Sequence, residues 1–226
     1  MKIIKPGKFD YQWTDAERDN FDNINLEYLK LGEKVDIIFY GDSITACWPI
    51  KNYFSSKINV INRAIGGDRT RYMLYRFDAD CVQFYPKKVV FLGGINDIRA
   101  WSKREDYFSN MSEINMTEEI TNNIFSMARK CKANGIEFII SSILPTNEEN
   151  MDNLLINEKI IEINGILRKY CLEEKLVFID YYKEFVLENS IYVNKEKTLD
   201  GLHPNENGYE IMKKILFKGI GDYNEI

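Results

Sequence analysis

The sequence predicts an α/β domain built on a parallel β-sheet with helices on both faces. Five short segments are apolar throughout instead of alternating with polar residues, which is typical of strands buried on both faces. Helical segments separate them, and this regular alternation favours a parallel sheet with right-handed crossovers. The predicted strands are residues 35–40, 60–62, 89–92, 137–143 and 177–179.

The helices that separate these strands are predicted from apolar residues at helical spacing. A first helix is expected over residues 15–31, ahead of the first strand. Residues 117–135 open with glutamates and close with lysines and a glycine, as a helix should. Their apolar face comprises Ile120, Ile124, Met127, Ala128 and Cys131.

Two further helices are predicted in the second half of the chain. Residues 153–170 offer a broad apolar surface, although Gly165 weakens the helix slightly. This surface is expected to comprise Leu154, Leu155, Ile161, Ile166 and Leu167. Residues 205–219 form the last helix, with Tyr209, Met212, Ile215 and Leu216 facing inward.

Length and composition limit the classes of protein that the chain can belong to. The linkers between elements are short, so residues 1–226 are expected to form a single domain. The net charge of −5, without a block of Lys and Arg, argues against nucleic acid as the main partner. No apolar run has the length of a membrane span or the form of a signal peptide, so a cytoplasmic location is expected.

The four cysteines form no C-x-x-C pair, and the chain has one histidine. A zinc site of Cys/His type is therefore not expected, and no metal is predicted. Reduced thiols in a reducing compartment are the preferred interpretation.

Small and polar residues gather where the predicted strands end. The sequences are GDSIT at 41–45, NRAIGGDRT at 62–70, GGIND at 93–97 and DGLHP at 200–204. In parallel sheets the ligand binds beyond the carboxyl ends of the strands, so these loops are expected to share one site. Each motif alone also fits a turn or a helix cap.

Together, these loops contain the groups that acyl transfer requires. Ser43 is the candidate nucleophile, and His203, the only histidine, is the candidate base. Asp200 precedes His203 by three residues, so its carboxylate can orient the imidazole. The backbone N–H groups of Ser43 and Gly67 and the side chain of Asn96 can donate to a developing oxyanion.

Two aspartates beside these groups are expected to support the site without taking part in the chemistry. Asp42 is predicted to make a turn or helix-start hydrogen bond next to Ser43. Asp97 is predicted to brace its own loop after Asn96.

The four loop sequences, with DGLHPNENGY at 200–209, resemble the signature blocks of the SGNH (GDSL) hydrolases, in the same order. This resemblance implies a flavodoxin-like three-layer α/β/α sandwich with a five-stranded parallel sheet. It also implies Ser43 as nucleophile, a His203–Asp200 pair, and an oxyanion hole formed by Ser43, Gly67 and Asn96. Members hydrolyse carboxylic esters, which implies a small-molecule ester substrate and no metal or other cofactor.

Two segments near these loops have a second interpretation. Asp68, Arg69 and Arg71 could bind an anionic group, but surface ion pairs are the preferred interpretation. Residues 100–116 follow the Asn96 loop and contain Trp101, Tyr107 and Phe108. They form either a flap over the site or a surface helix that packs its aromatic residues inward.

Several functions stay open at the level of the sequence. A serine esterase that acts on a small acyl ester, such as an acetylated carbohydrate, is the leading hypothesis. A lysophospholipase or thioesterase that acts on longer acyl chains is the main alternative. A flavodoxin-like binding module is disfavoured because both nucleotide-binding glycine motifs are absent. An inactive scaffold is disfavoured because every required side chain is present.

Overall fold

The structure, a computed structural model, describes residues 4–5 and 15–221. Within these residues the fold is built on one five-stranded parallel sheet in the order β2-β1-β3-β4-β5. The order is that of flavodoxin-like sheets, so the predicted fold class is confirmed. The strands are β1 (Ile37–Gly41), β2 (Val60–Asn62), β3 (Lys88–Leu92), β4 (Glu137–Ser141) and β5 (Phe178–Ile179).

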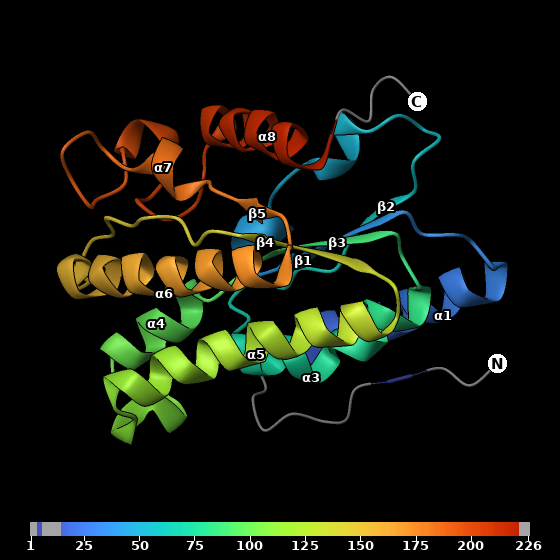
Figure 1. Ribbon diagram of the computed structural model, residues 1–226, viewed down its shortest axis with the longest axis horizontal. Helices are drawn as coiled ribbons and strands as arrows, with labels where there is room; N and C mark the ends of the chain where they lie inside the picture. Colours follow the sequence, from blue (N-terminus) through green and yellow to red (C-terminus); the bar gives the residue numbers. More distant parts are fainter. Residues whose placement is uncertain (1–3, 6–14, 222–226) are drawn as a thin grey trace.

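Helices cover both faces of this sheet (Figure 1). One face is covered by α1 (Asp15–Leu31), α3 (Thr70–Asp80), α4 (Ile95–Ser102), α5 (Glu113–Ala133) and α6 (Asn153–Glu174). The longest helix of the opposite face is α8 (Glu206–Ile220). Short helices complete the described part: α2 (Ser43–Ala46), α7 (Tyr182–Phe185), and the 3₁₀ turns η2 (Ile50–Tyr53), η3 (Val82–Phe84), η4 (Asp106–Asn110) and η5 (Lys195–Lys197).

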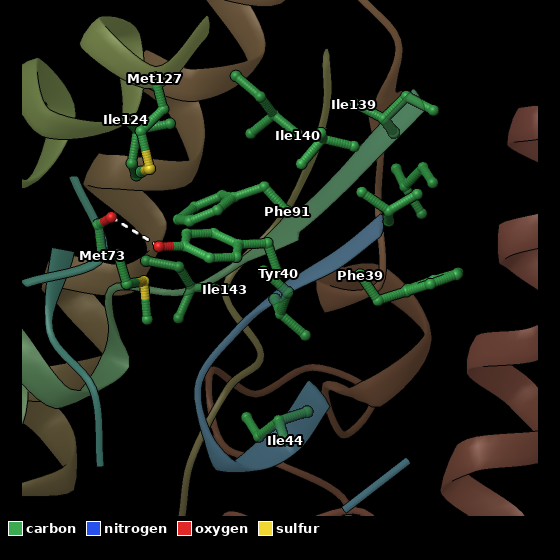
Figure 2. Packing of buried hydrophobic residues seen from close by; sticks show 14 of the residues in the cluster. Phe39, Tyr40, Ile44, Met73, Phe91, Ile124, Met127, Ile139, Ile140 and Ile143 are labelled. Carbon is green, nitrogen blue, oxygen red and sulfur yellow. Dashed lines mark hydrogen bonds between the residues drawn. The ribbon is translucent and has the colours of Figure 1, made fainter. Parts of the chain in front are cut away.

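Neighbouring residues of β1 serve the two faces of the sheet. Tyr40 packs toward α3 and donates its hydroxyl hydrogen to the Met73 carbonyl at 2.7 Å (Figure 2). Phe39 points the other way and meets the Trp48 ring edge-on at 6.0 Å between centroids. Both side chains are buried. The alternation of a pleated strand thus explains why the strand is apolar throughout.

The inward face of α6 differs in part from the predicted one. Leu154 and Ile161 are 52% and 43% exposed. The helix buries Leu167, as predicted, together with Ile156, Ile160 and Ile163, which were not predicted. The prediction failed because α6 carries apolar residues around most of its circumference, so that several stripes were compatible with the sequence.

Two buried asparagines on α6 explain which stripe faces inward. Asn164 accepts the Ile143 N–H and donates to the Ile143 carbonyl, at 2.8 and 2.9 Å. Asn157 makes the same pair of hydrogen bonds with Thr146, at 2.9 and 2.8 Å. Because buried backbone groups need partners, these side chains fix the extended segment that follows β4.

The apolar residues predicted for α5 are all buried, as expected. The prediction that residues 1–226 form a single domain stays a prediction, because residues 1–3, 6–14 and 222–226 lie outside the described part.

Candidate active site

The structure brings Ser43 together with His203 and Asp200. Ser43 lies 160 positions before His203 in the sequence, whereas Asp200 and His203 share one loop. The hydroxyl oxygen of Ser43 lies 2.9 Å from Nε2 of His203. Nδ1 of His203 lies 2.7 Å from Oδ2 of Asp200. With a proton on Nδ1 donated to Asp200, the lone pair of Nε2 is free to accept the Ser43 hydroxyl hydrogen.

Local hydrogen bonds shape the loop that carries His203. Oδ1 of Asp200 accepts the backbone N–H groups of Leu202 and His203, at 3.0 and 2.8 Å. Gly201 has φ of +86°, and a Cβ there would lie 2.2 Å from the Asn147 carbonyl oxygen. This turn therefore requires glycine, both for its backbone conformation and for the close approach of Asn147.

Opposing effects act on the Asp200 carboxylate. Partial burial raises its pKa, but hydrogen bonds from the backbone and the ring of His203 outweigh this effect. The net result is a pKa below the ordinary value of 3.8. Asp200 is therefore held as the anion that a histidine N–H needs as its acceptor.

Helix α8 holds the His203 loop beside Ser43. The hydroxyl of Tyr209 on α8 donates to the carbonyl of Ile44 on α2 at 2.9 Å. The Tyr209 ring also stacks on Trp48, with 5.8 Å between centroids. Trp48 is 4% exposed and belongs to the core. These contacts fix the distance between the two loops that meet in the site.

Ser43 is the first residue of the short helix α2. Asp42 caps this helix by accepting the Ile44 N–H at 3.0 Å, which agrees with the predicted helix-start hydrogen bond. Its side chain is fully buried, and burial raises the pKa of Asp42 to about 7. This cap fixes the turn that carries both the backbone N–H and the hydroxyl of Ser43.

The predicted oxyanion donors Gly67 and Asn96 line the same cavity. Gly67 has φ of +76°, a conformation that favours glycine. Nδ2 of Asn96 donates to the Asp68 carbonyl at 3.1 Å, and Oδ1 of Asn96 accepts from Arg99 at 3.3 Å. These two contacts fix which way the amide points and leave one N–H of Nδ2 for a ligand.

Asp97 braces the neighbouring loop and not its own, contrary to the prediction. Its carboxylate accepts the backbone N–H of Thr70 at 3.0 Å and the Thr70 hydroxyl at 2.8 Å. Burial raises the pKa of Asp97 to about 7, although the bonds from Thr70 lower it. Because Thr70 opens α3 directly after the Gly67 loop, Asp97 joins the two segments that carry Gly67 and Asn96.

The surface ion pair predicted for Asp68 is not observed. It is fully buried and pairs with Arg76 at 2.8 Å, and Arg76 also pairs with Asp80 at 2.8 Å. The prediction failed because the sequence does not reveal that Arg76, on α3, turns under the loop. Arg71 does form an exposed pair, with Glu119 at 2.8 Å.

Arg69 combines the two predicted interpretations, an ion pair and a place where an anionic group could bind. It is 4% exposed, and its guanidinium lies 3.5 Å from Glu105. The same side chain lines the cavity beside Gly67 and Asn96.

The segment 100–116 is structured, and its aromatic residues pack inward. Trp101 ends the buried face of α4 and is 4% exposed, and Phe108 in η4 is fully buried. The Arg71 guanidinium lies over the Tyr107 ring, with its Cζ 3.9 Å from the centroid of that ring. These observations favour the packed surface segment over an unstructured flap.

Sequence reasoning missed three supporting residues of the site. Arg76 braces the Gly67 loop from below, and Arg99 holds the Asn96 amide. Asn147 donates its N–H to the Gly201 carbonyl at 2.8 Å and so supports the His203 loop. Two asparagines seven residues apart on the predicted helix, Asn157 and Asn164, were a readable signal for the ordered segment that contains Asn147.

The side chains of the site form a network of hydrogen bonds. Within the described residues, no group of three or more His, Cys, Asp or Glu side chains is placed to hold a metal ion. None of the helices in that part of the chain has the length and apolar character needed to cross a bilayer.

Comparison with known proteins identifies relatives of this fold. Among curated proteins, an acetylxylan esterase of Geobacillus stearothermophilus is 21% identical over 218 residues, which cover 85% of this chain and 97% of the relative. A solved structure from Bacteroides fragilis is 28% identical, with a TM-score of 0.77, and covers 93% of this chain and 98% of that chain. A GDSL-like lipase from Bacteroides thetaiotaomicron is also 28% identical, with a TM-score of 0.71 and coverages of 88% and 98%.

The family model that matches is the GDSL-like Lipase/Acylhydrolase family, over residues 39–211. This range begins in β1, ends in α8 and includes all four loops of the site. Because the match spans more than half of the chain, the protein belongs to the GDSL-like lipase/acylhydrolase family and is an ester hydrolase.

Proposed function

We propose that the protein hydrolyses esters through a Ser43–His203–Asp200 triad and an acyl-enzyme intermediate. The observation that carries this proposal is the continuous contact from the Ser43 hydroxyl to His203 Nε2, at 2.9 Å, and from His203 Nδ1 to Asp200, at 2.7 Å. A nucleophile, a base and a group that orients the base are the parts that such a mechanism needs.

In the proposed first step, His203 takes the hydroxyl proton as Ser43 Oγ attacks the ester carbonyl carbon. The oxyanion accepts hydrogen bonds from the N–H groups of Ser43 and Gly67 and from the Asn96 amide. His203 then gives its proton to the leaving alcohol oxygen as the C–O bond breaks. Water, deprotonated by the same ring, attacks the acyl-enzyme and releases the acid and free Ser43.

We propose an acetylated carbohydrate as the substrate. The support is the acetylxylan esterase of Geobacillus stearothermophilus, of which the match covers 97%. Alanine variants of a serine and of a histidine are catalytic mutants of that enzyme. A serine–histidine pair on the same fold is what the contact between Ser43 and His203 offers in this chain. A cytoplasmic location stays a prediction.

The proposal is tested by labelling with a fluorophosphonate and by alanine substitution. We expect the label on Ser43, and we expect Ser43→Ala and His203→Ala each to lower kcat for 4-nitrophenyl acetate by about 10⁴ or more. Ser56→Ala, at an exposed serine in the loop before β2, is the matched control and should keep wild-type labelling and rate. Near wild-type activity of Ser43→Ala would refute the triad.

The length of the acyl chain is tested separately. An acetyl esterase should hydrolyse 4-nitrophenyl acetate with a higher kcat/KM than 4-nitrophenyl octanoate. A clear preference for octanoate would favour the lysophospholipase or thioesterase alternative. A mainly apolar hollow lined by Cys47, Leu199, His203, Pro204 and Tyr209, among others, is the surface on which a longer chain could lie.

A further inference from the structure

One face of α4 connects the proposed oxyanion hole to two cationic side chains. Arg99, Ala100 and Lys103 lie three, four and seven residues after Asn96, which places all four on one stripe of the helix. All four line a cavity of about 170 Å³ together with Gly67, Arg69 and Glu105. Since a helix rises 1.5 Å per residue, Lys103 lies roughly 10 Å along the helix from Asn96.

Cationic side chains outnumber acidic ones in the lining of this cavity. Arg69, Arg99 and Lys103 are cations, and Glu105 is the acidic residue of the lining. Glu105 lies 3.5 Å from Arg69, and Glu148, outside the lining, lies 2.7 Å from Arg99. Each of the two arginines therefore has a carboxylate partner among the described side chains.

Lys103 is the cation of the lining that has no carboxylate partner among the side chains that the structure describes. It is exposed at the end of α4. Nε of Arg99 is buried and has no hydrogen-bond partner among the described residues. The lining of the cavity therefore includes a lysine without a carboxylate partner among these side chains, and an arginine with one unused N–H donor.

We propose that this cavity binds a carboxylate group carried by the ester substrate. The inference rests on the proposed function, because Gly67 and Asn96 belong both to the cavity and to the proposed oxyanion hole. One lysine without a carboxylate partner matches a monoanion better than a doubly charged phosphate. The two arginines already hold carboxylates, Glu105 and Glu148, so their donors suit that group.

The carboxylate can belong to the acyl chain or to the alcohol. The cavity is lined by the oxyanion donors and not by His203, beside which the leaving alcohol must lie. This geometry suits an acidic acyl chain. An acetylated sugar acid would instead reach the cavity from the alcohol side. Both substrates present the same chemical group, and the experiment separates them.

The test compares initial rates for two matched pairs of esters in a pH-stat. The acyl-side pair is monomethyl glutarate against methyl pentanoate, and the alcohol-side pair is O-acetylglucuronic acid against O-acetylglucose. We expect wild-type kcat/KM for the acidic member of one pair to exceed that of the neutral member by at least about fivefold, the effect of a partly exposed ion pair. Added salt should reduce this ratio.

Variants decide whether the cavity causes the preference. Lys103→Met should bring the acidic-to-neutral ratio close to one. Lys57→Met is the matched control and should keep the wild-type ratio. This exposed lysine precedes β2 and so lies at the amino end of the strands, away from the site at their carboxyl ends. A preference in the glutarate pair assigns the carboxylate to the acyl chain, and one in the sugar pair assigns it to the alcohol.

Two results would overturn the inference. One is hydrolysis of the neutral esters without preference in either pair, which leaves the proposed esterase standing. The other is a preference that Lys103→Met does not reduce. Failure to hydrolyse these esters and 4-nitrophenyl acetate would remove the proposed function as well.

Discussion

The two sides of the candidate site are held in place in different ways. On the His203 side, Asp200 is more than half exposed and is bonded mainly to residues within its own loop. On the Gly67 side, the supporting side chains Asp97 and Arg76 are fully buried and bond to other segments. The first side depends on local hydrogen bonds, and the second depends on the packed interior.

This difference separates catalysis from stability. An exposed carboxylate that touches only its own loop contributes little to folding, because water replaces its contacts easily. A buried charge that loses its partner destabilises the whole domain. Substitutions on the His203 side should therefore change the rate alone, whereas those beneath the Gly67 loop should change stability first.

The largest expected effect is on the rate, from Asp200→Asn. The remaining Oδ1 can still accept the N–H groups of Leu202 and His203, but the new amide opposes Nδ1–H and favours the wrong tautomer of the ring. We expect kcat to fall by about 10⁴. The free energy of unfolding in urea should stay within about 1 kcal/mol of wild type, and a larger loss would contradict the local character of this loop.

Arg76→Met should have the largest effect on stability. It leaves the buried carboxylates of Asp68 and Asp80 without their cation, which should cost about 3–5 kcal/mol in urea unfolding. Arg71→Met, on the same helix, removes an exposed partner of Glu119 and should cost less than about 1 kcal/mol. Equal losses in the two variants would contradict the contrast between buried and exposed pairs.

Asn96→Ala should lower kcat by about 10²–10³, because it removes one donor to the oxyanion. KM should change little if the donor acts mainly in the transition state. Steady-state kinetics with 4-nitrophenyl acetate measure both quantities. A rise in KM with unchanged kcat would instead assign Asn96 to ground-state binding.

A further expected effect is a dependence of stability on pH. Asp42 has a folded pKa of about 7 against an ordinary value of 3.8. Between these values the unfolded state ionises while the folded state stays protonated, so Asp42 destabilises the fold as the pH rises. Asp42→Asn should therefore gain stability relative to wild type from pH 4 to 7, on the order of 1 kcal/mol per pH unit.

Urea unfolding at several pH values measures this gain. Asp152→Asn, at the exposed N-cap of α6, is the matched control, because its carboxylate also accepts a helix N–H. A difference between Asp42→Asn and wild type that does not vary with pH would contradict a neutral Asp42 in the folded protein.

The same contrast explains what the sequence could predict. Asp200 and His203 are three residues apart, so their pairing is a property of one loop and is readable from the sequence. The sheet and its order of elements follow from apolar runs and their alternation with helices. The partners of Asp97 and Asp68 depend on which helix lies beneath which loop, and no local pattern contains that information. On α6, apolar residues on every side hid the stripe that packs against the sheet.

The hydrogen bond from Tyr209 to Ile44 has a consequence for synthesis of the chain. Ser43 and His203 are separated by 160 positions, and α8 must dock on α2 before they can meet. A chain emerging from the ribosome thus carries its serine long before it carries a working base. Hydrolytic competence should appear abruptly once α8 has docked, and not grow with the length of the nascent polypeptide.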